Sequence, residues 1–166
     1  CNNGYSISGN NTATPSCTGN KITLEFANGG HGTAPTSPAS CTYGSTFTMP
    51  SAMSATGYTF NKWSVNGNTF GAGQTNVTCN YTNLGVYSGT ATITGTWNLI
   101  EYTITYKLNG GANNSSNPSS YTIETATITL ANPTRSGYTF GGWYTTSNFS
   151  GSAVTQIAKG STGNKT

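Results

Sequence analysis

The stretch that decides the fold is Gly-Tyr-Thr-Phe-Asn-Lys-Trp at residues 57–63, because it returns as Gly-Tyr-Thr-Phe-Gly-Gly-Trp at residues 137–143. The tryptophans that close the two copies, Trp63 and Trp143, lie 80 positions apart. In each copy the Tyr and Phe alternate with smaller or polar residues, a pattern typical of a strand. The sequence therefore predicts the same strand twice.

A second block repeats at nearly the same distance. Residues 22–30 run from an isoleucine into Asn-Gly-Gly, and residues 104–111 do the same, with their last glycines 81 positions apart. Two separate blocks kept at one offset indicate a tandem duplication. In each copy a strand runs into a turn, where glycine adopts the backbone angles that other residues avoid. The predicted turn glycines are Gly29, Gly30, Gly110 and Gly111.

The duplication predicts how the chain is divided. We expect a leader segment at residues 1–20, a first module at 21–100 and a second at 101–166, which stops where its last strand would begin. Further alternation typical of half-buried strands occurs at residues 90–97, 102–108 and 121–130. Prolines and Asn-Gly pairs punctuate the chain between them, and long amphipathic helices are absent from the pattern. The predicted fold class is mainly β.

The chain has four cysteines: Cys1, Cys17, Cys41 and Cys79. No two of them form a Cys-x-x-Cys motif, and four cysteines can pair into disulfides in three ways. We favour Cys1 with Cys17, which bracket a short loop rich in Gly, Asn and Ser, and Cys41 with Cys79, which lie inside one repeat. The first bridge would close the leader segment. Alternatively, Cys1 is the lipid-modified N-terminal cysteine of a bacterial lipoprotein, which would leave one thiol unpaired.

Six aromatic residues of the duplicated strand are interpreted as core. A module of about 75 residues needs two or three large rings to bury enough apolar area. These predicted core residues are Tyr58, Phe60, Trp63, Tyr138, Phe140 and Trp143. The alternative is that some of them, or Tyr144, are exposed platforms on which sugars stack.

Charged residues make up only 5% of the chain, and none of them is Asp. The three carboxylates, Glu25, Glu101 and Glu124, lie in separate strand-like segments, whereas acid–base catalysis needs two of them close together. His31 is the sole histidine and follows two glycines in a predicted turn, so a second imidazole for a metal site does not exist. We expect a non-enzymatic protein without metal or cofactor.

The same composition bears on partners and location. A net charge of +3 spread over six separated cations does not make the basic stripe of a nucleic-acid-binding protein. No run approaches the roughly 18 apolar residues that span a bilayer, and we expect any signal peptide to lie outside the sequence. Thr, Asn, Ser and Gly supply solubility in place of charge, as in strand-and-turn proteins outside the cell.

With these residues in view, Pro-Thr-Arg-Ser-Gly-Tyr-Thr-Phe-Gly-Gly-Trp-Tyr at residues 133–144 resembles the Listeria/Bacteroides repeat of bacterial surface proteins, a relative of the internalin B-repeats. Residues 102–166 supply the whole pattern except its closing strand. Residues 21–98 depart from it at Asn61-Lys62 and in a longer insertion that carries Cys79, and residues 1–20 lie outside it. The resemblance implies β-grasp-like modules, found in tandem on cell surfaces, that bring no catalytic residue.

We therefore expect a structural or adhesive protein of the bacterial cell surface, either anchored or secreted. Its expected partners are other copies of itself, neighbouring repeats, a surface protein or a polysaccharide. One alternative is a self-assembling filament subunit whose open second module accepts a strand from a neighbour. The open module would also arise if the 166 residues are the ordered part of a longer chain. The other alternative is a carbohydrate-binding module.

Overall fold

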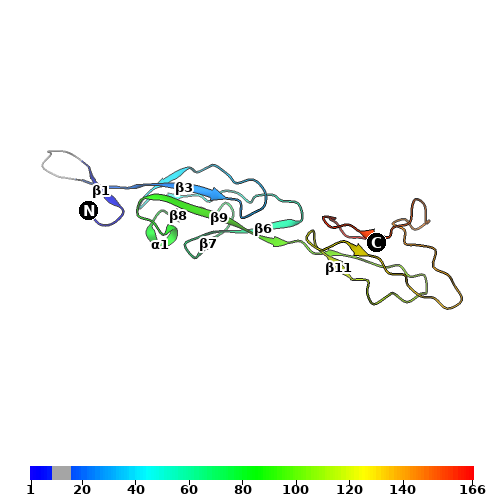
Figure 1. Ribbon diagram of the computed structural model, residues 1–166. Helices are drawn as coiled ribbons and strands as arrows, with labels where there is room; N and C mark the ends of the chain where they lie inside the picture. The colour runs from blue at the N-terminus through cyan, green and yellow to red at the C-terminus, as the bar shows by residue number, and fades with distance from the viewer. Residues whose placement is uncertain (9–15) are drawn as a thin grey trace. The chain divides into compact units, whose positions relative to one another are not determined.

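The structure is a computed structural model that describes residues 1–8 and 16–166 (Figure 1). The chain forms two compact units, Cys1–Asn98 and Leu99–Thr166. The chain is mainly β, as the sequence predicts, and the helix described is one turn, α1 (Tyr81–Leu84). Within the described residues, no helix is long and apolar enough to cross a membrane.

The first unit is organised around a five-stranded sheet in the order β4-β3-β9-β6-β7. Its strands are β3 (Lys21–Ala27), β4 (Ser40–Thr42), β6 (Tyr58–Val65), β7 (Asn68–Phe70) and β9 (Gly89–Leu99). β9 is the central strand and runs parallel to β3 over six residue pairs. A second sheet pairs β5 (Thr46–Phe47) with β8 (Val77–Thr78).

Buried and exposed residues alternate along the strands of this unit, and the buried ones form its core. Ile22 and Leu24 of β3 are buried between exposed neighbours, and Ala91 and Ile93 of β9 follow the same rule. Because successive side chains of a strand point to opposite faces, both strands turn one apolar face to the same core. The Trp63 side chain is fully buried there, and its indole N–H donates a hydrogen bond to the carbonyl of Pro50 (3.0 Å).

The N-terminal segment is a two-stranded antiparallel ribbon of β1 (Tyr5–Ser8) and β2 (Ser16–Gly19). A disulfide between Cys1 and Cys17 closes it, and a second disulfide joins Cys41 of β4 to Cys79 after β8. These are the two pairings that the spacing favoured.

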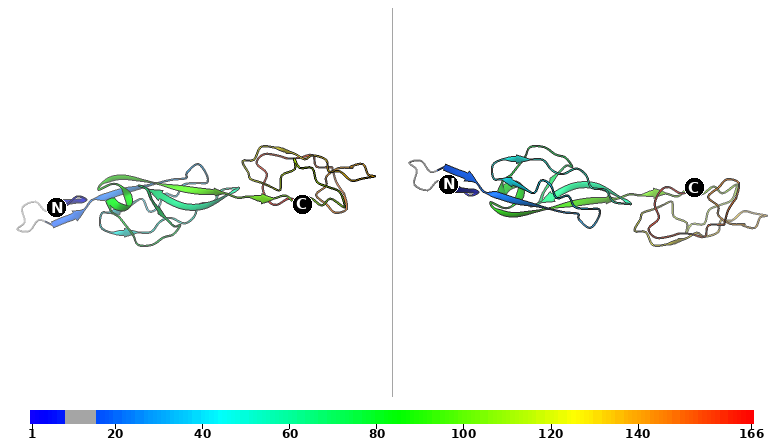
Figure 2. Two further views of the ribbon diagram at one scale, coloured as in Figure 1. Left: turned by 90° about the horizontal axis from the view of Figure 1, so that it is seen from below. Right: turned by 90° about the horizontal axis from the view of Figure 1, so that it is seen from above.

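The second unit has much less regular structure (Figure 2). Two short antiparallel pairs are formed, by β10 (Tyr102–Thr103) with β11 (Ser120–Tyr121) and by β12 (Ile128–Thr129) with β13 (Gln156–Ile157). A small core cluster contains Ile104, Tyr121 and Ile157. β9 has no full-length counterpart among the described residues of this unit. The likeness to a β-grasp remains a prediction.

The structure corrects the alignment of the two copies. The sequence matches Ile22 with Ile104, but the backbone matches Leu24 with Ile104, since their N–H groups donate to the equivalent carbonyls of Ala39 and Ser119. The copies are therefore related by one constant offset of 80 residues from this strand to the tryptophans. The physical reason is that burial and strand pairing, rather than residue identity, fix register in a sheet.

Candidate functional site

Of the three predicted core aromatics of the first unit, Trp63 and Phe60 belong to the core cluster, whereas Tyr58 lies outside it. Trp63 is at the centre of the cluster, and Phe60 packs against it with ring centroids 5.0 Å apart. Tyr58 is half-buried and stacks on His31, with centroids 3.7 Å apart. His31 also meets the edge of Trp97, so the predicted turn histidine belongs to an aromatic cluster. The sequence holds no local signal for this contact, because Trp97 is 66 positions away.

In the second unit the equivalent rings are less covered. Phe140 and Trp143 are half-buried, with centroids 5.1 Å apart. Tyr138 contradicts its predicted core position, because its side chain is 67% exposed. The Arg135 guanidinium lies 3.9 Å from the centre of its ring and satisfies that face by a cation–π contact. Without a neighbouring strand, this part of the segment has no core to enter.

The four turn glycines act in two different ways. Gly29, Gly30 and Gly110 have the positive φ angles that tight turns require. Gly111 does not, but it closes its turn, because its N–H donates to the Leu108 carbonyl (2.9 Å), and a Cβ there would lie 2.9 Å from the Thr134 carbonyl oxygen.

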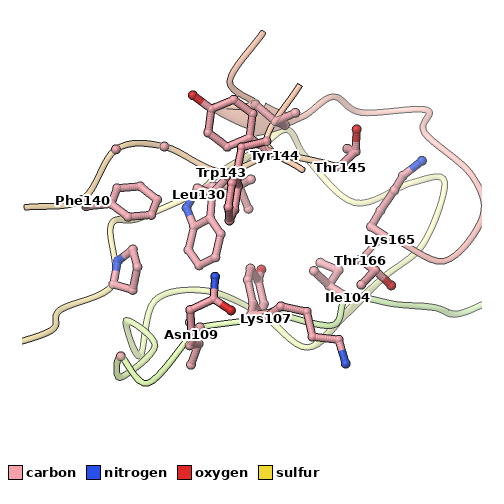
Figure 3. A pocket seen from close by; sticks show the side chains of 18 of the residues that line it. Ile104, Lys107, Asn109, Leu130, Phe140, Trp143, Tyr144, Thr145, Lys165 and Thr166 are labelled. Carbon is pink, nitrogen blue, oxygen red and sulfur yellow. The ribbon is translucent and has the colours of Figure 1, made fainter. Parts of the chain in front are cut away.

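The main hollow of the second unit is a groove of about 1070 Å³ (Figure 3). Phe140 and Trp143 lie on one side of it, and Ile104 and Thr166 lie on the other. Leu130, Val154 and Ile157 add further apolar surface. The groove is therefore an open extension of the small core rather than a closed cavity.

Backbone as well as side chains line this groove. Ile104 and Lys165 form an isolated parallel bridge, in which the Lys165 N–H donates to the Thr103 carbonyl and the Thr105 N–H donates to the Lys165 carbonyl (both 2.9 Å). Beyond this bridge, residues 105–108 and 138–142 belong to no strand in the part of the chain that the structure describes. In the first unit the equivalent residues 25–27 are in β3 and the equivalent residues 58–62 are in β6.

The charged groups of the groove are cationic. Lys107, Arg135 and Lys165 line it, and no carboxylate does so among the described residues. The Lys165 ammonium donates to the Thr162 carbonyl (3.0 Å). Tyr106 also lines the groove; burial raises the pKa of its phenol, which donates to the Pro118 carbonyl (3.0 Å). These like charges disfavour a cationic ligand in the groove.

Within residues 1–8 and 16–166, no group of three His, Cys, Asp or Glu side chains is placed to hold a metal ion. All four cysteines are in disulfides.

Comparison with known proteins gives one result for the two units. Residues 22–87 and 102–166 each match the family profile described as the Listeria-Bacteroides repeat domain. No curated protein and no solved structure matches the chain. The matched ranges begin at Ile22 and Tyr102, which reproduces the 80-residue offset found in the backbone hydrogen bonds.

Proposed function

Since this chain belongs to the Listeria-Bacteroides repeat family, which is typical of bacterial surface proteins, we propose that it is a non-enzymatic, load-bearing segment of an extracellular stalk or adhesin. Its location would be the bacterial cell surface or the medium around it. Its partners would be neighbouring repeats or other surface molecules. The support comes from the pairing of the first and last strands of the first module, β3 and β9.

The observation that carries this proposal is the parallel pairing of β3 with β9. The module begins with β3 and ends with β9, and the two strands are hydrogen-bonded from Ile22–Gly89 to Ala27–Thr94. Tension between the two ends of the module therefore loads these hydrogen bonds in shear, so that they must break together. A hairpin pulled from its open end breaks its bonds one after another. The shear arrangement is the one that a stalk under load requires.

The disulfide between Cys41 and Cys79 supports the same role. It closes a loop with a sequence separation of 38 that contains β5, β6, β7 and β8. Even after β3 and β9 separate, the chain between the two cysteines cannot extend. The module would therefore lengthen by a limited amount and keep part of its structure under load.

Single-molecule pulling on the whole chain tests the proposal. Attachment beside β3 and beside the end of β9, at Asn20 and Asn98, should give a higher unfolding force than attachment at Asn20 and Gly67, in the turn between β6 and β7. Reduction of the disulfides should lengthen the extension per unfolding event. Equal forces in the two geometries would contradict a load-bearing role, since forced unfolding reports the barrier along the pulled direction.

Location is tested separately. Antibodies raised against the first unit should label intact and permeabilised cells equally. Labelling only after permeabilisation would contradict an extracellular role.

A further inference from the structure

We propose that the ribbon of β1 and β2 and the first module, which begins with β3, move as one rigid body. They are joined by a tyrosine lock, formed by the pairs Gly4-Tyr5 of the ribbon and Tyr43-Gly44 of the module. The ribbon is then a stiff arm that fixes the direction in which the chain enters β3, rather than a flexible leader. This inference goes beyond the load-bearing proposal and does not depend on it.

The chain leaves little length for a hinge between the ribbon and the module. β2 ends at Gly19 and β3 begins at Lys21, so a single residue, Asn20, lies between them. The Asn20 N–H donates to the Gly4 carbonyl, and the Tyr43 N–H donates to the Asn20 carbonyl (both 2.8 Å). The backbone of Asn20 is therefore bonded on one side to the ribbon and on the other to the module.

The side chain of Asn20 bridges the joint in the same way. Its Oδ1 accepts a hydrogen bond from the Ser6 hydroxyl, and its Nδ2 donates to the Tyr87 carbonyl (3.4 Å). Ser6 belongs to β1 of the ribbon, whereas Tyr87 lies between α1 and β9 of the module. A bend at Asn20 would break hydrogen bonds that each contribute about 1 kcal/mol.

Two tyrosines cross the joint, one from each side. Tyr5 and Tyr43 meet edge to face with ring centroids 5.3 Å apart, and Tyr87 adds a third ring 5.9 Å from Tyr43. Each ring of the first pair also covers the glycine beside the other. A Cβ at Gly4 would lie 2.4 Å from the Tyr43 ring, and a Cβ at Gly44 would lie 2.5 Å from the Tyr5 hydroxyl. The ribbon and the module therefore interdigitate, with no room for a side chain at either glycine.

A third glycine brings the two backbones together. A Cβ at Gly19 of β2 would lie 2.2 Å from the Tyr43 carbonyl oxygen, which is a backbone atom and cannot turn away as a side chain does. The φ angle of Gly19 is not positive, unlike those of Gly4 and Gly44. Glycine is needed at this position for space alone, because other residues can adopt its backbone conformation.

The module side of the lock is fixed to the core. The Gly44 N–H donates to the Cys79 carbonyl, and the Cys79 N–H donates to the Ser45 carbonyl (both 2.8 Å). Cys79 is fully buried and is joined to Cys41 by a disulfide. The turn that carries Tyr43 therefore cannot shift without the core, and a ribbon held by Tyr43 is held by the core as well.

Residual dipolar couplings of the whole chain test the proposal, since they report whether two segments keep one common orientation. We expect a single alignment tensor to fit the amides of β1, β2, β3 and β9. Gly19→Ala should free the ribbon and reduce its couplings at least about twofold relative to those of β3 and β9.

The matched control is Gly71→Ala. The φ angle of Gly71 is likewise not positive, and a Cβ there would meet the Gln74 Oε1 only at 3.8 Å. This variant should leave the ribbon couplings unchanged. Reduced ribbon couplings in the unaltered chain, or equal ribbon couplings in all three proteins, would overturn the proposal.

A second pair of variants covers the case that Gly19→Ala misfolds. Tyr5→Ala removes one ring of the lock, and its control, Ile7→Ala, removes a 69% exposed side chain from the same strand. Smaller ribbon couplings in Tyr5→Ala alone, with unchanged amide exchange in β1 and β2, would support the lock. Smaller couplings in both variants or in neither would contradict it. Faster exchange in β1 and β2 of Tyr5→Ala would also contradict it, because the ring would then stabilise the ribbon itself rather than its attachment.

Discussion

Trp63 and Trp143 are the same residue of the repeat in two packing environments. Each donates a hydrogen bond from its indole N–H to a backbone carbonyl. Trp63 donates to Pro50 (3.0 Å), and Trp143 donates to Ala131 (3.3 Å). Trp63 is fully buried in the five-stranded unit, whereas Trp143 is half-buried beside the groove. The hydrogen bond is therefore a property of the repeat, and the burial depends on the neighbouring strand.

This difference predicts unequal costs for the same substitution. Trp63→Ala should lower the free energy of unfolding of the first unit by about 3–5 kcal/mol, since it leaves a cavity in a closed core. Trp143→Ala should cost the second unit about 1–2 kcal/mol, because part of the side chain is already in contact with solvent. Urea unfolding of the whole chain measures both. Equal costs would show that the two cores are equally closed.

The exposed ring of Tyr138 shows the limit of prediction at this scale. Gly-Tyr-Thr-Phe occurs in both copies, yet Tyr58 stacks on His31 while Tyr138 lies 67% exposed under Arg135. The equivalent of His31 in the second unit is Gly111, which offers no ring to stack on. A local motif cannot report a partner that lies tens of residues away.

Strands differ in how well the sequence predicts them. The alternating residues 90–97 fall within β9, and the repeated strand at residues 58–63 falls within β6. Residues 138–143, with almost the same sequence, form no strand except for a single bridge of Trp143 to Val154. A strand exists only with a partner, so its existence depends on contacts that propensity does not contain.

The two disulfides lie in different surroundings, and only one of them is in the core. Cys41–Cys79 ties the edge strand β4 to the segment before α1, and both cysteines are buried in the core of the first unit. Cys1–Cys17 closes the ribbon of β1 and β2, where Cys17 is exposed. Only the first of them constrains the core.

Removing the bridges should therefore have unequal effects. Cys41→Ser together with Cys79→Ser should lower the free energy of unfolding of the first unit by about 2–4 kcal/mol, as expected for a closed loop of this length. The matched pair, Cys1→Ser with Cys17→Ser, should change it by less than about 1 kcal/mol, because the ribbon opens locally. Guanidinium unfolding of both variants provides the measurement. An equal loss would place the ribbon within the cooperative core.

On the scale of the whole molecule, the chain is two copies of the Listeria-Bacteroides repeat that differ in how much regular structure they contain. In the first copy, β9 is the central strand of the sheet and pairs in parallel with β3. The second copy has a single parallel bridge, from Ile104 to Lys165, and a groove beside it. Family and repeat could be predicted from sequence, whereas the groove required the backbone register.

Hydrogen exchange of the unmodified chain, resolved by residue, tests this difference most directly. Amides of β3, β6 and β9 should exchange at the slow rate set by unfolding of the first unit. Amides of residues 105–108 and 138–142 should exchange at least about a hundredfold faster, because no neighbouring strand protects them. Equal protection of equivalent residues in the two units would contradict the account, since it would mean that the second module is already closed.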